Sequence, residues 1–119
     1  MHNSKSNVQT RKKSHLKCKN RFIAFNDTQF NYGDYLDNDN NIIEFQCNVK
    51  LQGFSLGDNY TSDFLCVKAD KTMIVMETID KKNLLKPKNL KLLEESRHYW
   101  LARGVEWKLI IGEKTNGKE

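Results

Sequence analysis

Two short apolar runs separated by a polar tetrad constrain the fold of this chain more than any other feature. The runs span residues 64–67 and 73–76, and the tetrad between them is Lys68-Ala69-Asp70-Lys71. Apolar runs of this length joined by a few polar residues predict a β-hairpin with a short loop.

Two acidic residues flank this hairpin. Asp63 precedes the first run and Glu77 follows the second. Because side chains alternate along a strand, we expect Glu77 on the same face as Met73, Val75 and Ile79. Burying a carboxylate there is costly without a metal ion or a cation as partner. Asp63 and Glu77 are therefore expected to converge at the open edge of the hairpin and to hold Mg²⁺. Alternatively, Asp63 caps a turn and Glu77 is a solvated strand end.

The charge distribution suggests an anionic partner. The 119 residues carry a formal net charge of +5 and have a pI near 9.1, which makes nucleic acid the first candidate. Basic residues dominate the stretch before Asp27, the first acidic residue, and those expected to contact DNA are Arg11, Lys12, Lys13, Lys17, Lys19 and Arg21. We expect residues 1–20 to form a flexible basic arm, 21–112 the folded domain and 113–119 a charged tail. A solvated arm that binds nothing is the alternative.

The cysteine spacing and the hydropathy indicate the compartment in which the protein is expected. Cys18, Cys47 and Cys66 show no Cys-x-x-Cys spacing and form no zinc-ligand pattern with the three histidines, so reduced thiols are expected. Cys66 lies in an apolar run and is interpreted as a small buried hydrophobic residue. No apolar run approaches the length of about 18 residues that a transmembrane helix needs. The N-terminus lacks the apolar core of a signal peptide, so a cytoplasmic location is expected.

The remaining elements follow from capping and periodicity. A helix begins after Asn26 or Asp27 and ends at the turn residues 37–41; residues 42–49 alternate as a strand. A second helix has Pro87 in its first turn and ends before Gly104, and residues 107–111 form a last strand. We expect Tyr99 and Trp100 to pack against the sheet rather than to stack on bases. A strand, a crossover helix and a strand give a right-handed parallel unit, so the chain is predicted to be α/β, with a mixed sheet of four or five strands flanked by helices.

Four stretches carry a family resemblance. They read Thr-Ser-Asp-Phe-Leu at 61–65, Glu-Thr-Ile at 77–79, Glu-Glu-Ser-Arg-His-Tyr-Trp at 94–100 and Gly-Val-Glu-Trp at 104–107. With the order of the elements, they resemble the restriction-endonuclease-like PD-(D/E)xK core, and within it the N-terminal catalytic domain of the TnsA-type transposition endonucleases. The resemblance covers roughly residues 20–112. The resemblance does not extend to the separate C-terminal domain with which TnsA-type proteins meet their transposase partner.

The resemblance implies metal-dependent hydrolysis of a DNA phosphodiester. Asp63 and Glu77 would hold Mg²⁺ or Mn²⁺ as catalytic ligands. Gln29 stands where the family has a first-helix Glu, and it offers only a neutral oxygen. Ile79 stands where the family has its catalytic Lys, and losing one such donor typically costs on the order of 10² to 10³ in rate.

Nearby residues of the right chemistry offer replacements for both missing groups. Lys81 or Lys82 would supply a migrated cation, and Asp27 would substitute for Gln29. Three hypotheses follow. The chain is an active Mg²⁺-dependent DNA endonuclease, or a degraded nuclease fold that binds DNA or a protein as an accessory or inhibitor from a mobile element, or an α/β domain without a nucleic-acid role.

Overall fold

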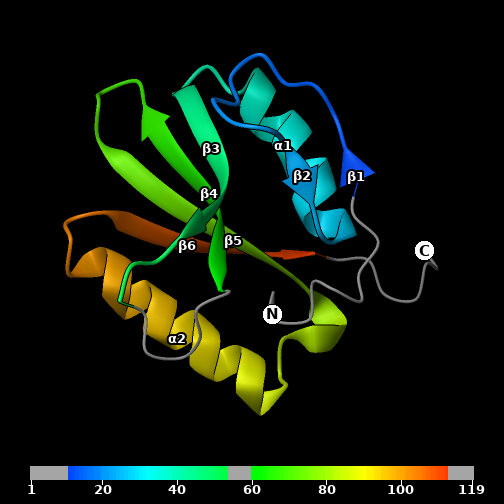
Figure 1. The fold of residues 1–119 in the computed structure, drawn as a ribbon, viewed down its shortest axis with the longest axis vertical. Helices are drawn as coiled ribbons and strands as arrows, with labels where there is room; N and C mark the ends of the chain where they lie inside the picture. Colours follow the sequence, from blue (N-terminus) through cyan, green and yellow to red (C-terminus); the bar gives the residue numbers. More distant parts are fainter. Residues whose placement is uncertain (1–10, 54–59, 113–119) are drawn as a thin grey trace.

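A four-stranded mixed sheet flanked by two helices forms the centre of the molecule (Figure 1). The computed structural model describes residues 11–53 and 60–112. The strands β3 (Ile42–Lys50), β4 (Thr61–Lys68), β5 (Met73–Asp80) and β6 (Glu106–Gly112) lie in the order β3-β4-β5-β6. β3, β4 and β5 are antiparallel neighbours, and β6 runs parallel to β5. The prediction of an α/β fold with a mixed sheet and flanking helices is confirmed.

The expected hairpin is formed by β4 and β5, with Phe64 opposite Met76 and Val67 opposite Met73. The short helical turn η2 (Lys81–Asn83) and the helix α2 (Pro87–Leu101) then carry the chain to β6. Pro87 occupies the first turn of α2, where the missing N–H removes no helical hydrogen bond. The crossover and its parallel strand pair are also as predicted from the sequence.

Each face of the sheet has its own hydrophobic core. On one face, the helix α1 (Asp27–Asn38) buries Leu36 against Phe45 and Phe64. On the other face, α2 buries Trp100 close to Val75. Figure 1 shows the two helices on opposite sides of the sheet. Trp100 therefore packs in the core, as predicted. Neither helix in the described part of the chain has the length and apolar character needed to cross a membrane.

The segment before α1 packs against the domain. Two short strands, β1 (Arg11–Lys12) and β2 (Ile23–Ala24), pair antiparallel, and Cys18 forms a parallel bridge to Phe45. The N–H of Lys19 donates to the Phe45 carbonyl at 2.8 Å, and the Phe45 N–H donates to the Lys17 carbonyl at 2.9 Å. Residues 11–20 are thus part of the fold, which corrects the prediction of a flexible arm over this stretch. Residues 1–10 and the predicted tail, 113–119, lie outside the described residues.

Candidate functional site

Glu77 lies fully buried in β5 and is the centre of a polar cluster on the α2 side of the sheet. Its Oε1 accepts a hydrogen bond from the Tyr60 hydroxyl. Its Oε2 accepts from the hydroxyls of Ser62, at 2.7 Å, and Ser96, and from the Trp107 indole N–H at 3.4 Å. Each carboxylate oxygen is therefore bound by donors of the protein itself.

A second indole extends this network. Trp100 Nε1 donates to Ser62 Oγ at 2.8 Å, and the Oγ atoms of Ser62 and Ser96 are 3.2 Å apart. The network thus connects β4, β5, β6 and α2. We call Tyr60, Ser62, Glu77, Ser96, Trp100 and Trp107 the Glu77 cluster. Buried polar groups that all find partners of this kind rigidify a core.

Burial raises the pKa of Glu77 above the ordinary value of 4.5, and the negative charge of Asp63 raises it further. The hydrogen bonds from Ser96, Tyr60 and Ser62 oppose this shift because they stabilise the charged form. Burial, followed by the charge of Glu77, also raises the pKa of the Tyr60 hydroxyl well above its usual value. The Tyr60 hydroxyl therefore keeps its proton and donates a hydrogen bond to Glu77.

Asp63 is also fully buried, but its hydrogen bonds differ from those of Glu77. Its Oδ2 accepts from the Thr78 backbone N–H at 2.6 Å and from the Thr78 hydroxyl at 2.7 Å. The pairing of β4 with β5 ends at Phe64 and Met76, and Asp63 binds the backbone of β5 just beyond this last pair.

The side-chain alternation of β4 is interrupted at Asp63. Phe64 packs in the core on the α1 side, whereas Ser62 contacts α2. In a regular strand, residues two positions apart face the same side of the sheet. On the neighbouring strand, Asn48 has a left-handed φ of 54° between the pairs that align Cys47 with Phe64 and Val49 with Ser62. This irregularity turns Ser62 toward Glu77.

The positions of Asp63 and Glu77 correct the prediction of an open edge. Asp63 and Glu77 are both fully buried, so neither lies at an exposed rim, and neither the capped turn nor the solvated strand end describes them. The two carboxylates are nevertheless close enough for the charge of Asp63 to raise the pKa of Glu77.

The other predicted site residues are also placed by the structure. Gln29 is buried, and its side chain accepts from the Phe25 N–H at 2.9 Å and donates to Asn48 Oδ1 at 2.9 Å. Ile79 is buried. Asp27 forms an ion pair with Arg11 at the surface and so does not replace Gln29. The candidate migrated cations, Lys81 and Lys82, are exposed in η2, whereas Asp63 and Glu77 are buried.

The arrangement does not fit a magnesium ion. Mg²⁺ binds through one or two carboxylates and keeps water or phosphate oxygens as its other ligands, which requires access to the carboxylates. Asp63 and Glu77 have no solvent exposure, and an indole N–H of Trp107 points at Glu77, where it would repel a cation. Among the described residues, no group of three or more His, Cys, Asp or Glu side chains is placed to hold a metal ion.

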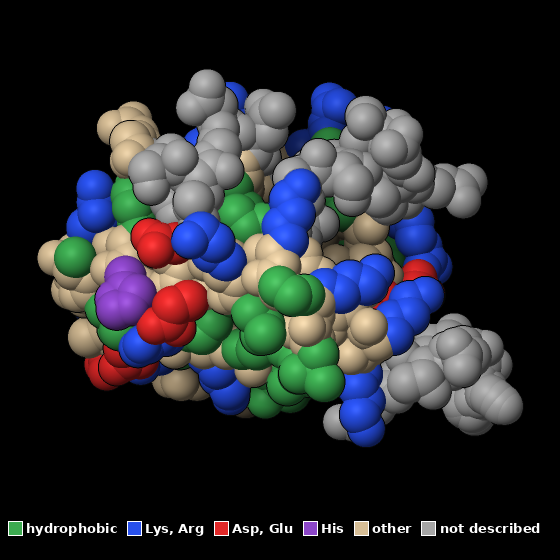
Figure 2. Space-filling view, turned by 90° about the horizontal axis from the view of Figure 1, so that it is seen from below, with side chains coloured by type: hydrophobic (Ala, Val, Ile, Leu, Met, Phe, Trp, Pro, Cys, Tyr) green, Lys and Arg blue, Asp and Glu red, His purple; other side chains and the backbone are tan. Residues whose placement is uncertain are grey.

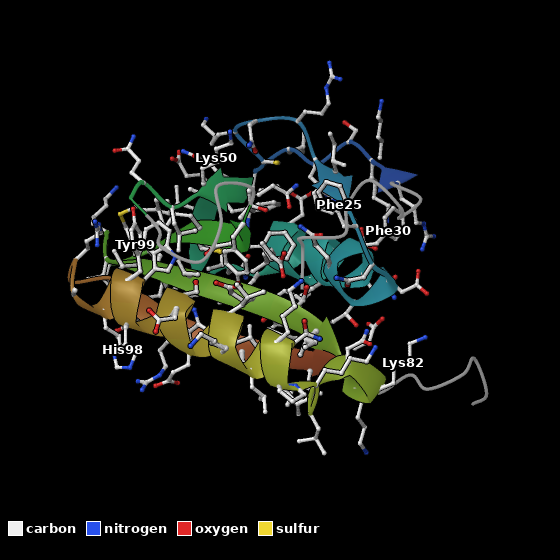
Figure 3. The ribbon with its side chains drawn as sticks, turned by 60° about the horizontal axis from the view of Figure 1, so that its bottom comes forward. Phe25, Phe30, Lys50, Lys82, His98 and Tyr99 are labelled. Atoms are coloured by element: carbon white, nitrogen blue, oxygen red, sulfur yellow. The ribbon has the colours of Figure 1, made fainter. Side chains whose placement is uncertain are left out.

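A cationic surface lies at the start of α2. Between Asp80 and Glu94 the chain has no acidic residue, and five lysines in this stretch are exposed: Lys81, Lys82, Lys86, Lys88 and Lys91. None of them forms an ion pair with a carboxylate of the described residues. We call these five the α2 lysine surface. Figure 3 places Lys82 beside the start of α2, and Figure 2 shows basic side chains around exposed hydrophobic ones on this side of the molecule.

The cations predicted to bind DNA from the arm have a different environment. Arg11 pairs with Asp27 at 2.6 Å, Lys13 with Asp34 at 2.8 Å and Lys19 with Glu44 at 3.8 Å. Lys17 Nζ donates to the Asp39 carbonyl at 2.8 Å, while Lys12 and Arg21 are exposed. Acidic groups of the domain therefore offset much of the positive charge in this segment.

No protein-family model and no curated protein matches the chain. The residues that the sequence interpretation missed are the partners of Glu77: Tyr60, Ser62, Ser96 and Trp107. One signal was present in the sequence. Ser96 lies on the apolar face of α2 with Leu92, Leu93 and Trp100, and a hydroxyl on a buried helix face indicates a polar partner across the core.

Proposed function

We propose that this protein binds DNA through the α2 lysine surface and uses a PD-(D/E)xK-like core as a non-catalytic scaffold. The order α1-β3-β4-β5-α2-β6, with the last strand parallel to its neighbour, supports the nuclease-like core. The closed hydrogen bonding of Glu77 supports the absence of cleavage, because donors of the protein occupy the carboxylate that a metal ion would need. The TnsA-type resemblance makes an accessory role in a mobile element, beside a transposase, the biological setting of this proposal.

The observation that carries DNA binding is the uncompensated charge at the start of α2. The positive end of a helix dipole disfavours cations, yet Lys86 and Lys88 lie beside it and the first turn contains no acidic residue. Nor does the side chain of Lys86, the N-cap residue, cap the first turn of α2. The positive end of a helix dipole favours an anion at this position. A phosphate bound there would interact with both the lysines and the helix N-terminus. A DNA-binding role also needs a compartment that contains DNA, and the expected cytoplasmic location is part of this proposal.

Two variants of equal charge change test the position of the surface. Replacing Lys82, Lys88 and Lys91 with Gln should weaken binding of duplex DNA roughly tenfold or more and make the log–log salt slope less negative by about 2.7, since each phosphate contact contributes about 0.9. The control replaces Lys12, Lys19 and Arg21 with Gln and should leave both quantities unchanged. Fluorescence anisotropy between about 50 and 200 mM salt measures both. The opposite pattern would assign binding to the N-terminal cations.

A plasmid-nicking assay tests the absence of catalysis. With Mg²⁺ or Mn²⁺, we expect the wild-type protein and the Asp63→Ala variant to leave supercoiled plasmid equally intact, because Asp63 and Glu77 are buried. Nicking by the wild type that Asp63→Ala abolishes would establish the endonuclease hypothesis instead. That result would leave the DNA-binding proposal untouched, since the two assays are read separately.

A further inference from the structure

Two thiols far apart in the sequence meet where the N-terminal segment crosses β3. The Sγ atoms of Cys18 and Cys47 are 3.7 Å apart. Cys47 is buried in the core on the α1 side, whereas Cys18 is half-buried and lines a surface cavity of about 650 Å³. The third cysteine, Cys66, is fully buried in the same core.

The backbone holds the two thiols in place. The bridge between Cys18 and Phe45 fixes one side of the pair. On the other side, the Asn20 amide donates to the Cys47 carbonyl and accepts from the Cys47 N–H, both at 2.9 Å. A disulfide needs an S–S distance of about 2.05 Å, so the sulfur atoms must approach by less than 2 Å. Side-chain rotation from positions held this close can supply that approach.

We propose that Cys18 and Cys47 form a reversible disulfide that fastens the N-terminal segment to β3, and that a small anionic disulfide such as glutathione disulfide is the oxidant. The Cys18 thiolate attacks one sulfur of the oxidant, which forms a mixed disulfide and releases one thiolate. Cys47 then attacks Cys18 Sγ, its proton passes to a released thiolate, and the second small thiol leaves. The oxidant gains two electrons and the pair of cysteines loses two.

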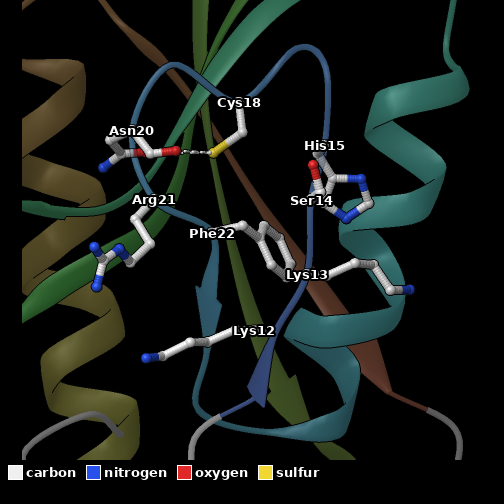
Figure 4. Close-up of a pocket in the computed structure, with 8 residues that line it drawn as sticks. All are labelled: Lys12, Lys13, Ser14, His15, Cys18, Asn20, Arg21 and Phe22. Atoms are coloured by element: carbon white, nitrogen blue, oxygen red, sulfur yellow. Dashed lines mark hydrogen bonds between the residues drawn. The ribbon is translucent and has the colours of Figure 1, made fainter.

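The chemistry of the surroundings gives the two thiols different roles. A hydrogen bond from Cys47 lowers the pKa of Cys18 to about 7, against the opposing effect of its burial. Cys18 therefore attacks first, because the thiolate is the reactive form. The hydrogen bond with Cys18 and burial raise the pKa of Cys47, so it suits the second step. Lys12 and Arg21 line the same cavity, and Figure 4 shows both side chains on the same side of the loop, which favours an anionic oxidant.

The proposal is tested on the full chain with glutathione disulfide as the probe. After oxidation at pH 8 and blocking of free thiols, mass spectrometry of the unreduced digest should show one peptide pair, joined through Cys18 and Cys47. The Cys66→Ser variant should give the same pair, whereas Cys18→Ser should give none. A stable mixed disulfide at Cys18, or a bond that involves Cys66, would overturn the proposal.

Two measurements on the wild-type chain avoid variants that fail to fold. Closing a loop of this length should raise the melting temperature by roughly 10 °C on oxidation, and dithiothreitol should reverse the shift. The alkylation rate of Cys18 should level off above about pH 7, as its lowered pKa requires. An unchanged melting temperature, or a rate that keeps rising to pH 9, would contradict the proposal. Neither measurement depends on DNA binding.

Discussion

At the scale of single residues, Glu77 illustrates how one side chain suggests different functions from sequence and from structure. A carboxylate on an apolar strand needs a partner, and that requirement was predicted correctly. The partner could not be identified, because the hydroxyl and indole donors come from Tyr60, Ser96 and Trp107, on other elements. Periodicity along one strand contains no information about them. Glu77 is therefore a structural acid in the core of the proposed scaffold.

The raised pKa of Glu77 makes a pH prediction. Because its folded pKa lies above the ordinary 4.5, the native state retains a proton that the unfolded chain has lost. The stabilisation is thus complete below pH 4.5 and is lost as the pH rises toward the folded pKa. Glu77→Gln carries no such proton. Urea unfolding should show the wild type losing up to about 1.4 kcal/mol per pH unit relative to Glu77→Gln across this window.

Glu94→Gln provides a matched control of opposite sign. Glu94 is exposed, and the hydrogen bond and charge of Arg97 lower its pKa. The contribution of ionised Glu94 to stability is present above its ordinary pKa and is lost in acid. The free energy of unfolding of the wild type should therefore rise slightly relative to that of Glu94→Gln as the pH rises. Parallel pH profiles for the wild type and Glu77→Gln would show that Glu77 does not titrate differently in the folded state.

At the scale of elements, the local rules located the helices and strands well. Asn26, one of the two residues predicted as the cap, caps α1, and its side chain accepts from the Gln29 N–H at 2.7 Å. Pro87 lies in the first turn of α2, as predicted. The change of face at Asp63 was not predictable, because it depends on the left-handed backbone of Asn48. Hydrogen bonds of the Asn48 side chain to Gln29 and to the Ile23 carbonyl accompany that conformation, and they join three separate segments. No local pattern encodes such a network.

Gly33 lets α1 approach the N-terminal segment closely. A Cβ at this position would overlap the ring of Phe22, which is buried, and would lie 3.2 Å from His15 Nε2. Gly33→Ala gains about 1 kcal/mol of helix propensity, but overpacking costs about 1–3 kcal/mol. We therefore expect Gly33→Ala to lower the free energy of unfolding by roughly 1 kcal/mol, measured by urea unfolding.

The Phe22→Leu background separates the two contributions to this change. A smaller side chain at position 22 removes the overlap with the ring, so Gly33→Ala should become neutral or stabilising there. The resulting double-mutant cycle measures the coupling between the two positions. If Gly33→Ala stabilises the wild-type chain as well, the close approach of α1 to Phe22 is not limited by packing.

At the scale of the whole molecule, the distribution of charge in space differs from its distribution along the chain. The sequence places basic residues first, and a free arm followed as the simplest interpretation. In the folded protein, Asp27 and Asp34 of α1 lie against Arg11 and Lys13, so these cations contribute to the fold. The cations of the α2 lysine surface remain uncompensated within the described residues. Contacts between segments that are distant in the sequence decide which cations stay unpaired, and sequence order does not contain these contacts.

Replacing residues 13–20 with a Gly/Ser linker of equal length tests whether this segment belongs to the domain. The change removes the packing of His15 on Phe22, whose rings lie 4.6 Å apart, which contributes about 1 kcal/mol. Without its side chains the segment is no longer held against β3, so the two backbone hydrogen bonds to Phe45 are lost, each contributing about 1 kcal/mol. The free energy of unfolding should therefore fall by about 3 kcal/mol. Substituting Leu16→Ser alone is the control and should change little, because Leu16 is 96% exposed. A linker variant as stable as the wild type would restore the flexible arm, because a segment that contributes nothing to stability does not belong to the fold.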